Sequence, residues 1–95
     1  MDYRSMGRRI QELRKQQGLT QQLLAERIGV STSYIGHIER GTRVLSLETF
    51  ASLCNALAVD PADLLQAAGY TLDHSRQFQQ AQQLLQLACR LASRG

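Results

Sequence analysis

Cysteines, aromatic residues and long apolar runs are all scarce in this chain of 95 residues. Its two cysteines, Cys54 and Cys89, lie far apart and form no C-x-x-C pair, so neither a metal site nor a disulfide framework is expected. No apolar run approaches the roughly 18 residues of a membrane span, and the N-terminus lacks the apolar segment of a secretory signal. The sequence therefore predicts a cytoplasmic protein with one modest domain, no membrane partner and no cofactor.

Catalytic patterns are lacking as well. His37 and His74 have no partner nearby in the sequence that would suggest catalysis, and both are expected to be ordinary polar residues. Neither an activated nucleophile nor a pair of catalytic acids can be identified. We therefore predict that the protein is not an enzyme.

Charge is distributed unevenly along the chain. Residues 1 to 45 contain eight arginines or lysines and four acidic residues, whereas residues 46 to 72 contain three acidic residues and no basic one. A basic first half beside an acidic second half favours one surface for a polyanion and another for a different contact. Charge alone leaves open the alternative of residues scattered over a solvated surface.

Helical patterns with capping residues follow one another from the N-terminus. The first predicted helix ends at Gln17 and Gly18, and the second is capped by Thr20 and ends at Gly29. The third is capped by Ser31 and ends at Gly41, and the fourth is capped by Ser46. The fifth begins at Asp60 and Pro61 and ends at Gly69. No alternating run is long enough for a strand. The fold class is therefore predicted to be all-α.

A sixth helix is predicted over residues 75 to 93, and it carries two apolar stripes. One stripe contains Phe78, Ala81, Leu85, Ala88 and Ala92, and the other contains Leu84, Leu87 and Leu91. Such a wide apolar band is more than one contact would cover, so one stripe is expected to pack on its own domain and the other to meet a second copy. A single broad core contact is the alternative.

Residues 21 to 40 contain the pattern that carries function. Where two helices cross steeply, the first needs a small residue, here Ala25, and the tight turn needs a residue that tolerates positive φ, here Gly29. The core beneath would be closed by Leu24, Ile28, Val30, Ile35 and Ile38. Together these positions indicate a helix-turn-helix.

Beyond this pattern, residues 6 to 67 resemble the phage repressor and Cro (Xre-type) helix-turn-helix family. The matching segments include L-A-E-R-I-G-V-S and S-Y-I-G-H-I-E-R-G, in unbroken order and spacing. The resemblance implies a five-helix repressor-like domain, assigned here to residues 1–69. Residues 70–95 would be a C-terminal helical extension, with Leu84, Leu87 and Leu91 in the dimer contact.

The resemblance also implies individual roles. The helix from Ser31 to Arg40 would lie in the major groove as the recognition helix. The residues that would contact DNA bases are Thr32, Ser33 and His37. The residues that would contact the DNA backbone are Gln21, Tyr34, Arg40 and Arg43, with Arg8, Arg9 and Lys15 as weaker candidates. Arg14 and Glu39 would form a structural ion pair. Gly36 is expected on the exposed face, where a missing side chain would let the helix approach DNA closely, or is a tolerated substitution.

The expected function is that of a sequence-specific DNA-binding transcriptional regulator, acting as a homodimer on a palindromic operator in double-stranded DNA. The alternative is an antitoxin or adaptor whose C-terminal helix binds a different protein. Stoichiometry distinguishes the two, because a stable homodimer in isolation favours the regulator.

Overall fold

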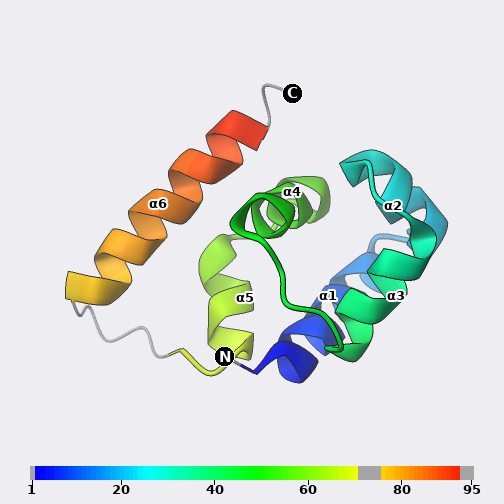
Figure 1. Ribbon diagram of the computed structural model, residues 1–95, viewed down its shortest axis with the longest axis horizontal. Coiled ribbons are helices and arrows are strands. Elements are labelled where there is room, and N and C mark those ends of the chain that lie inside the picture. The colour runs from blue at the N-terminus through cyan, green and yellow to red at the C-terminus, as the bar shows by residue number, and fades with distance from the viewer. Residues whose placement is uncertain (1, 71–75, 93–95) are drawn as a thin grey trace.

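Six helices make up the computed structural model, which describes residues 2–70 and 76–92 but not the side chains of residues 76–79 and 81. The helices are α1 (Tyr3–Gln16), α2 (Gln21–Ile28), α3 (Thr32–Arg40), α4 (Leu47–Leu57), α5 (Pro61–Ala67) and α6 (Arg76–Ala92) (Figure 1). The described ranges contain no strand, so the all-α prediction is confirmed. None of the described helices is long and apolar enough to cross a bilayer. His74 and the predicted ends of the sixth helix lie outside the described residues.

Local side-chain chemistry sets most helix boundaries. The predicted N-caps Thr20, Ser31, Ser46 and Asp60 each accept a hydrogen bond from a backbone N–H of the following turn. Gly29 and Gly41 adopt φ of 73° at the ends of α2 and α3, a conformation that costs glycine little. These boundaries were all predicted. A cap that was not predicted is Asp2, which begins α1 by accepting from the Ser5 backbone N–H at 3.0 Å.

The first and third helices touch backbone to backbone. A Cβ placed on Gly7 would lie 2.3 Å from the carbonyl oxygen of Ile38 and 2.6 Å from that of Glu39. Such distances leave no room for any side chain. Gly7 therefore sets the separation between α1 and α3, a role that the helix-turn-helix pattern did not reveal.

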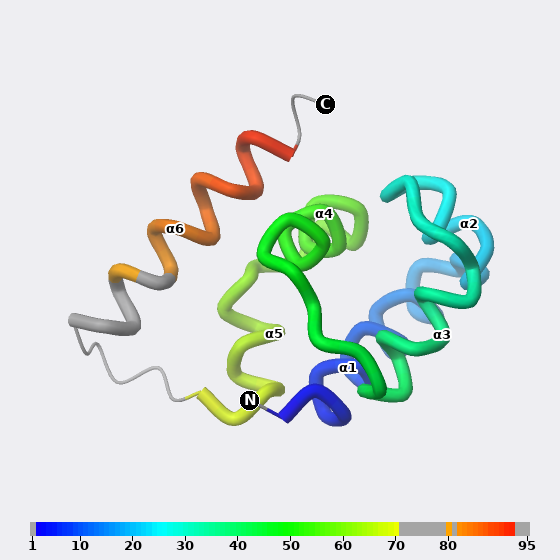
Figure 2. The backbone as a smooth tube through the Cα atoms, in the orientation of Figure 1, coloured from blue at the N-terminus to red at the C-terminus, as the bar shows by residue number. Residues whose placement is uncertain are grey.

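One core unites α1 to α5 and extends to α6. Its most deeply buried side chains include Met6, Ile10, Leu24, Ile35, Leu53, Leu57 and Leu64. The sixth helix contacts α4 and α5 and lies at the opposite end of the molecule from α2 and α3 (Figures 1 and 2). Leu85 is buried in this contact, and Asn55 Nδ2 donates to the Cys89 carbonyl at 2.7 Å. The side chains of Phe78 and Ala81, from the same predicted stripe, lie outside the description.

Candidate nucleic-acid interface

The third helix has one buried face and one solvent face. Ile35, Ile38 and Glu39 point into the protein, whereas Thr32 and Ser33 are exposed and His37 is half-buried. Ser33 and His37 are four residues apart, so they lie one above the other on the helix surface. The three predicted base-contacting residues therefore occupy the solvent side of α3.

Gly36 is not open to solvent, so the prediction of an exposed glycine is wrong. The residue is buried, and a Cβ added to it would meet Nη1 of Arg40 at 3.1 Å. The guanidinium of Arg40 lies over the glycine one turn earlier in the helix. Because that group is the end of a flexible side chain, it can move aside, and the space above Gly36 depends on where Arg40 points.

The imidazole of His37 belongs to a small hydrogen-bonded group at the end of α3. Its Nδ1 lies 3.0 Å from Oγ1 of Thr42 and 3.5 Å from Nη2 of Arg40. The Thr42 hydroxyl also donates to the backbone carbonyl of His37 at 3.1 Å. Sequence reasoning missed Thr42, because nothing in the spacing of the residues indicates that its hydroxyl folds back onto His37.

A buried ion pair fixes the inner side of α3. Arg14 donates from Nε to Oε2 of Glu39 at 2.7 Å and from Nη2 to Oε1 at 3.1 Å, and its Nη1 donates to the Leu19 carbonyl at 2.8 Å. The two side chains are only 9% and 2% exposed. Gln21 Nε2 donates to Glu39 Oε1 at 3.1 Å, so α1, α2 and α3 meet at one carboxylate.

The other predicted backbone-contacting residues are spread around this helix. Arg40 and Arg43 are exposed, at the end of α3 and in the following loop, and Tyr34 is half-buried against the core. Arg9, a weaker candidate, is instead held by Asp63 of α5 through two hydrogen bonds of 3.0 Å. These bonds with the Arg9 guanidinium lower the pKa of the Asp63 carboxyl below its usual value.

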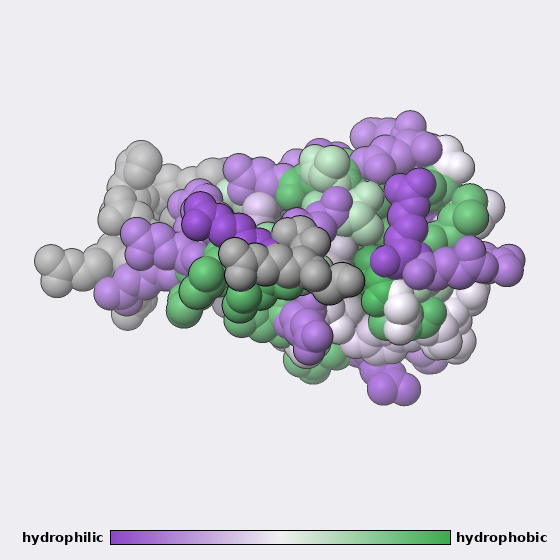
Figure 3. Space-filling view, turned by 90° about the horizontal axis from the view of Figure 1, so that it is seen from above, coloured by the Kyte–Doolittle hydropathy of each residue, from purple (hydrophilic) through white to green (hydrophobic). Residues whose placement is uncertain are grey.

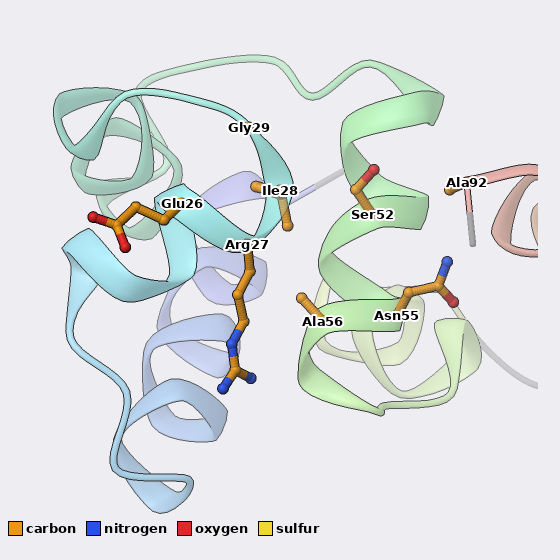
Figure 4. Close-up of a pocket in the computed structure, with 8 residues that line it drawn as sticks. All are labelled: Glu26, Arg27, Ile28, Gly29, Ser52, Asn55, Ala56 and Ala92. Atoms are coloured by element: carbon orange, nitrogen blue, oxygen red, sulfur yellow. The ribbon is translucent and has the colours of Figure 1, made fainter. Parts of the chain in front are cut away.

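A groove of about 670 Å³ lies between the end of α2 and the middle of α4 (Figure 4). Its lining residues are Glu26, Arg27, Ile28, Gly29, Ser52, Asn55, Ala56 and Ala92. Figure 4 shows Ile28 pointing toward α4, with Ser52 and Asn55 on the facing helix. None of the predicted DNA-contacting residues lines the groove, so it is separate from the solvent face of α3.

The two cysteines, distant in sequence, are neighbours where α4 meets α6. Both are free thiols, and Cys89 Sγ lies 3.8 Å from the Ala51 carbonyl oxygen. Burial, with a smaller effect of the adjacent Cys89, raises the pKa of the Cys54 thiol to about 12. Burial also raises the pKa of Cys89. At neutral pH both side chains therefore stay protonated and behave as small packing residues.

Comparisons with known proteins place this architecture in a family. The helix-turn-helix family model HTH_3 matches residues 10–64. The HTH-type transcriptional regulator YazB of Bacillus subtilis (strain 168) is 36% identical over 64 residues, which are 67% of this chain and 93% of that protein. The restriction-modification controller protein C.AhdI from Aeromonas hydrophila is 41% identical with a TM-score of 0.64, over 66% of this chain and 96% of that one.

A second solved structure extends the likeness beyond the helix-turn-helix. The clp gene regulator ClgR from Corynebacterium glutamicum is 32% identical with a TM-score of 0.68, and the match covers 97% of this chain and 94% of that one. The motif, the arrangement of α1 to α5 and the family match agree with one another. The chain belongs to the phage repressor and Cro (Xre-type) helix-turn-helix family of DNA-binding transcriptional regulators.

Proposed function

We propose that the chain is a sequence-specific regulator that binds a palindromic operator in double-stranded DNA as a homodimer. Residues 1–69 would bind DNA, and residues 70–95 would form the dimer contact. The observation that carries the proposal is the two-sided character of α3. Its inner face is held by the pair of Arg14 with Glu39, while its solvent face presents hydrogen-bonding side chains.

Those side chains suit the reading of base edges in the major groove. The hydroxyls of Thr32 and Ser33 can donate or accept, and so can the imidazole of His37. None of the three is a long bidentate reader such as arginine or glutamine, so thymine methyl contacts, water bridges and DNA shape would share the discrimination.

The remaining contacts would go to the phosphate backbone. Arg40 and Arg43 supply exposed cations at the end of α3 and beyond it. Gln21 lies at the first position of α2, where backbone N–H groups attract anions. Its amide gives one hydrogen bond to Glu39 and carries a second N–H that could reach a phosphate. Such contacts fix position and carry no sequence information.

Dimerisation is assigned to the outer stripe of α6. Leu84, Leu87 and Leu91 are 62%, 52% and 58% exposed, and Figure 3 shows apolar surface over the part of the molecule where α6 lies. The patch continues onto α4, because Leu47 and Leu91 line the same shallow depression of the surface. Burying this patch against a second copy would remove apolar area from water and so stabilise the dimer. In such a dimer the two recognition helices would read operator half-sites about 34 Å apart, which is one turn of DNA.

DNA binding can be tested by selecting sites from random DNA and then measuring variants. Arg43→Ala should weaken binding to all sequences similarly and reduce the salt slope by about one unit. His37→Ala should change which sequence is preferred. Arg27→Ala, which removes an exposed cation outside the proposed contacts, is the matched control for Arg43→Ala and should leave the salt slope and the preference almost unchanged. Equal weakening of every sequence by His37→Ala would exclude a base-reading role.

The dimer contact needs its own experiment. Sedimentation of the wild-type chain should show a dimer, and Leu87→Asp should convert it to a folded monomer because the charge would be buried in the contact. Gln86→Asp places the same charge on an exposed position of the same helix, on a different face from the three leucines, and should leave the dimer intact. A wild-type monomer would favour the antitoxin or adaptor alternative.

A further inference from the structure

We infer that Thr42 is a positioning residue that fixes the tautomer of His37, so that the ring presents a hydrogen-bond acceptor at Nε2. This inference rests on the proposed function, in which His37 reads a base. Thr42 lies outside the recognition helix and would touch no base itself. It would act on specificity only through the imidazole.

The inference comes from counting hydrogens in the two short contacts of the Thr42 hydroxyl. Its oxygen lies 3.1 Å from the His37 carbonyl and 3.0 Å from Nδ1 of the same residue. A hydroxyl has one hydrogen, and two bare oxygens this close would repel, so the hydrogen belongs to the contact with the carbonyl. The oxygen must then accept from the ring, which requires a hydrogen on Nδ1.

The reverse arrangement is less favourable. If the Thr42 hydroxyl donated to Nδ1, its contact with the carbonyl would contain no hydrogen. The single lone pair of Nδ1 would also be shared between Thr42 and the guanidinium of Arg40 at 3.5 Å. With the hydrogen on Nδ1, only this longest contact is left without a hydrogen bond. Movement of Arg40 toward a phosphate would remove that contact altogether.

A hydrogen on Nδ1 determines what the neutral ring can read. In neutral imidazole one nitrogen donates and the other accepts, so Nε2 is an acceptor. In the major groove, adenine and cytosine offer amino donors, whereas guanine and thymine offer acceptors. His37 would therefore select an amino group of adenine or cytosine at its base position, and a guanine oxygen there would face a lone pair.

Nuclear magnetic resonance tests the tautomer without DNA. Nitrogen-15 correlation spectra of the full chain, recorded at about pH 8, which is above the usual pKa of a histidine side chain, should show Nδ1 protonated and Nε2 unprotonated. Thr42→Val, which keeps the shape but loses the hydroxyl, should shift the ring toward the Nε2–H form, and Thr42→Ser should restore the wild-type spectrum. A wild-type ring protonated on Nε2, or a spectrum unchanged in Thr42→Val, would overturn the inference.

Site selection at the same pH then tests the consequence. The wild-type chain should prefer adenine or cytosine at the position that loses preference in His37→Ala, by roughly threefold to tenfold. Thr42→Val should lower this ratio toward one, and Thr42→Ser should keep it. An unaltered preference in Thr42→Val, or guanine or thymine preferred by the wild type, would refute the inference. Unaltered preference in His37→Ala would instead refute the base-reading role itself, which the spectra do not test.

Discussion

Replacing Glu39 by alanine should destabilise the fold strongly, although the residue lies on the helix assigned to DNA reading. The substitution removes the acceptor of two Arg14 hydrogen bonds and one Gln21 hydrogen bond. Arg14 is 9% exposed and would keep only its bond to the Leu19 carbonyl. Stranding one partner of a buried pair costs about 3–5 kcal/mol, and the bond that Arg14 keeps favours the lower end.

This cost is large enough for simple assays. For a domain of this size each kcal/mol lowers Tm by about 4–8 °C, so a loss near 3 kcal/mol corresponds to roughly 12–24 °C. Thermal melts and urea titrations followed by circular dichroism would measure it. Glu12→Ala is the matched control, because it breaks an ion pair whose carboxylate is 60% exposed. That change should cost less than about 0.5 kcal/mol.

A double substitution separates the lost pair from the stranded charge. Arg14→Met with Glu39→Leu removes both charges and fills the space with apolar atoms, so it should be more stable than the sum of the two single changes by about 2 kcal/mol or more. The reasoning would be refuted by a Glu39→Ala loss below about 1 kcal/mol, or by single changes that simply add.

Three further predictions concern other contacts. Gly7→Ala should destabilise the protein by about 1–3 kcal/mol because its Cβ would strike the backbone of α3. Gly36→Ala should instead stabilise it by up to about 1 kcal/mol because alanine has the higher helix propensity. Urea titrations should therefore give changes of opposite sign in the free energy of unfolding, and changes of the same sign would contradict this reasoning. Asp63 has a lowered pKa in the folded state, so its stabilisation is present above the unfolded pKa of about 3.9 and is lost as the pH falls through the folded value. Asp63→Asn should therefore be slightly less stable than wild type at neutral pH, and the Tm values of the two proteins should converge in acid. A difference in Tm that does not change with pH would exclude the ion pair as its cause. Cys54, which is buried, should react with a thiol reagent more slowly than the half-buried Cys89 until the chain is unfolded, and equal labelling rates in the folded protein would contradict this difference in burial.

Helix boundaries could be predicted from the sequence because they depend on neighbours in the chain. Ser31, Ser46 and Asp60 cap helices through backbone groups two or three residues away. The distance over which a cap acts is shorter than one helical turn. No knowledge of tertiary packing was needed to place it.

Contacts between distant segments could not be predicted in this way. The bond of Arg9 with Asp63 spans 54 positions, and the close approach at Gly7 depends on the angle at which two helices cross. Composition and periodicity carry no information about either. The pair of Arg14 with Glu39 was expected only because the sequence resembles a known family, and the additional bond from Gln21 was not expected at all.

Stability and base recognition are separable within α3, even though the residues concerned are neighbours in sequence. Glu39 faces inward and holds the helix against α1 and α2, while His37, two positions earlier, is directed to the solvent side. Weakening the ion pair of Arg14 with Glu39 lowers the folded population, and with it the apparent affinity for every DNA sequence equally. A changed His37 ring alters the difference between sequences and leaves the folded population almost unaffected. Comparing preference ratios at a temperature where each variant is folded therefore distinguishes residues that position the helix from those that read the DNA.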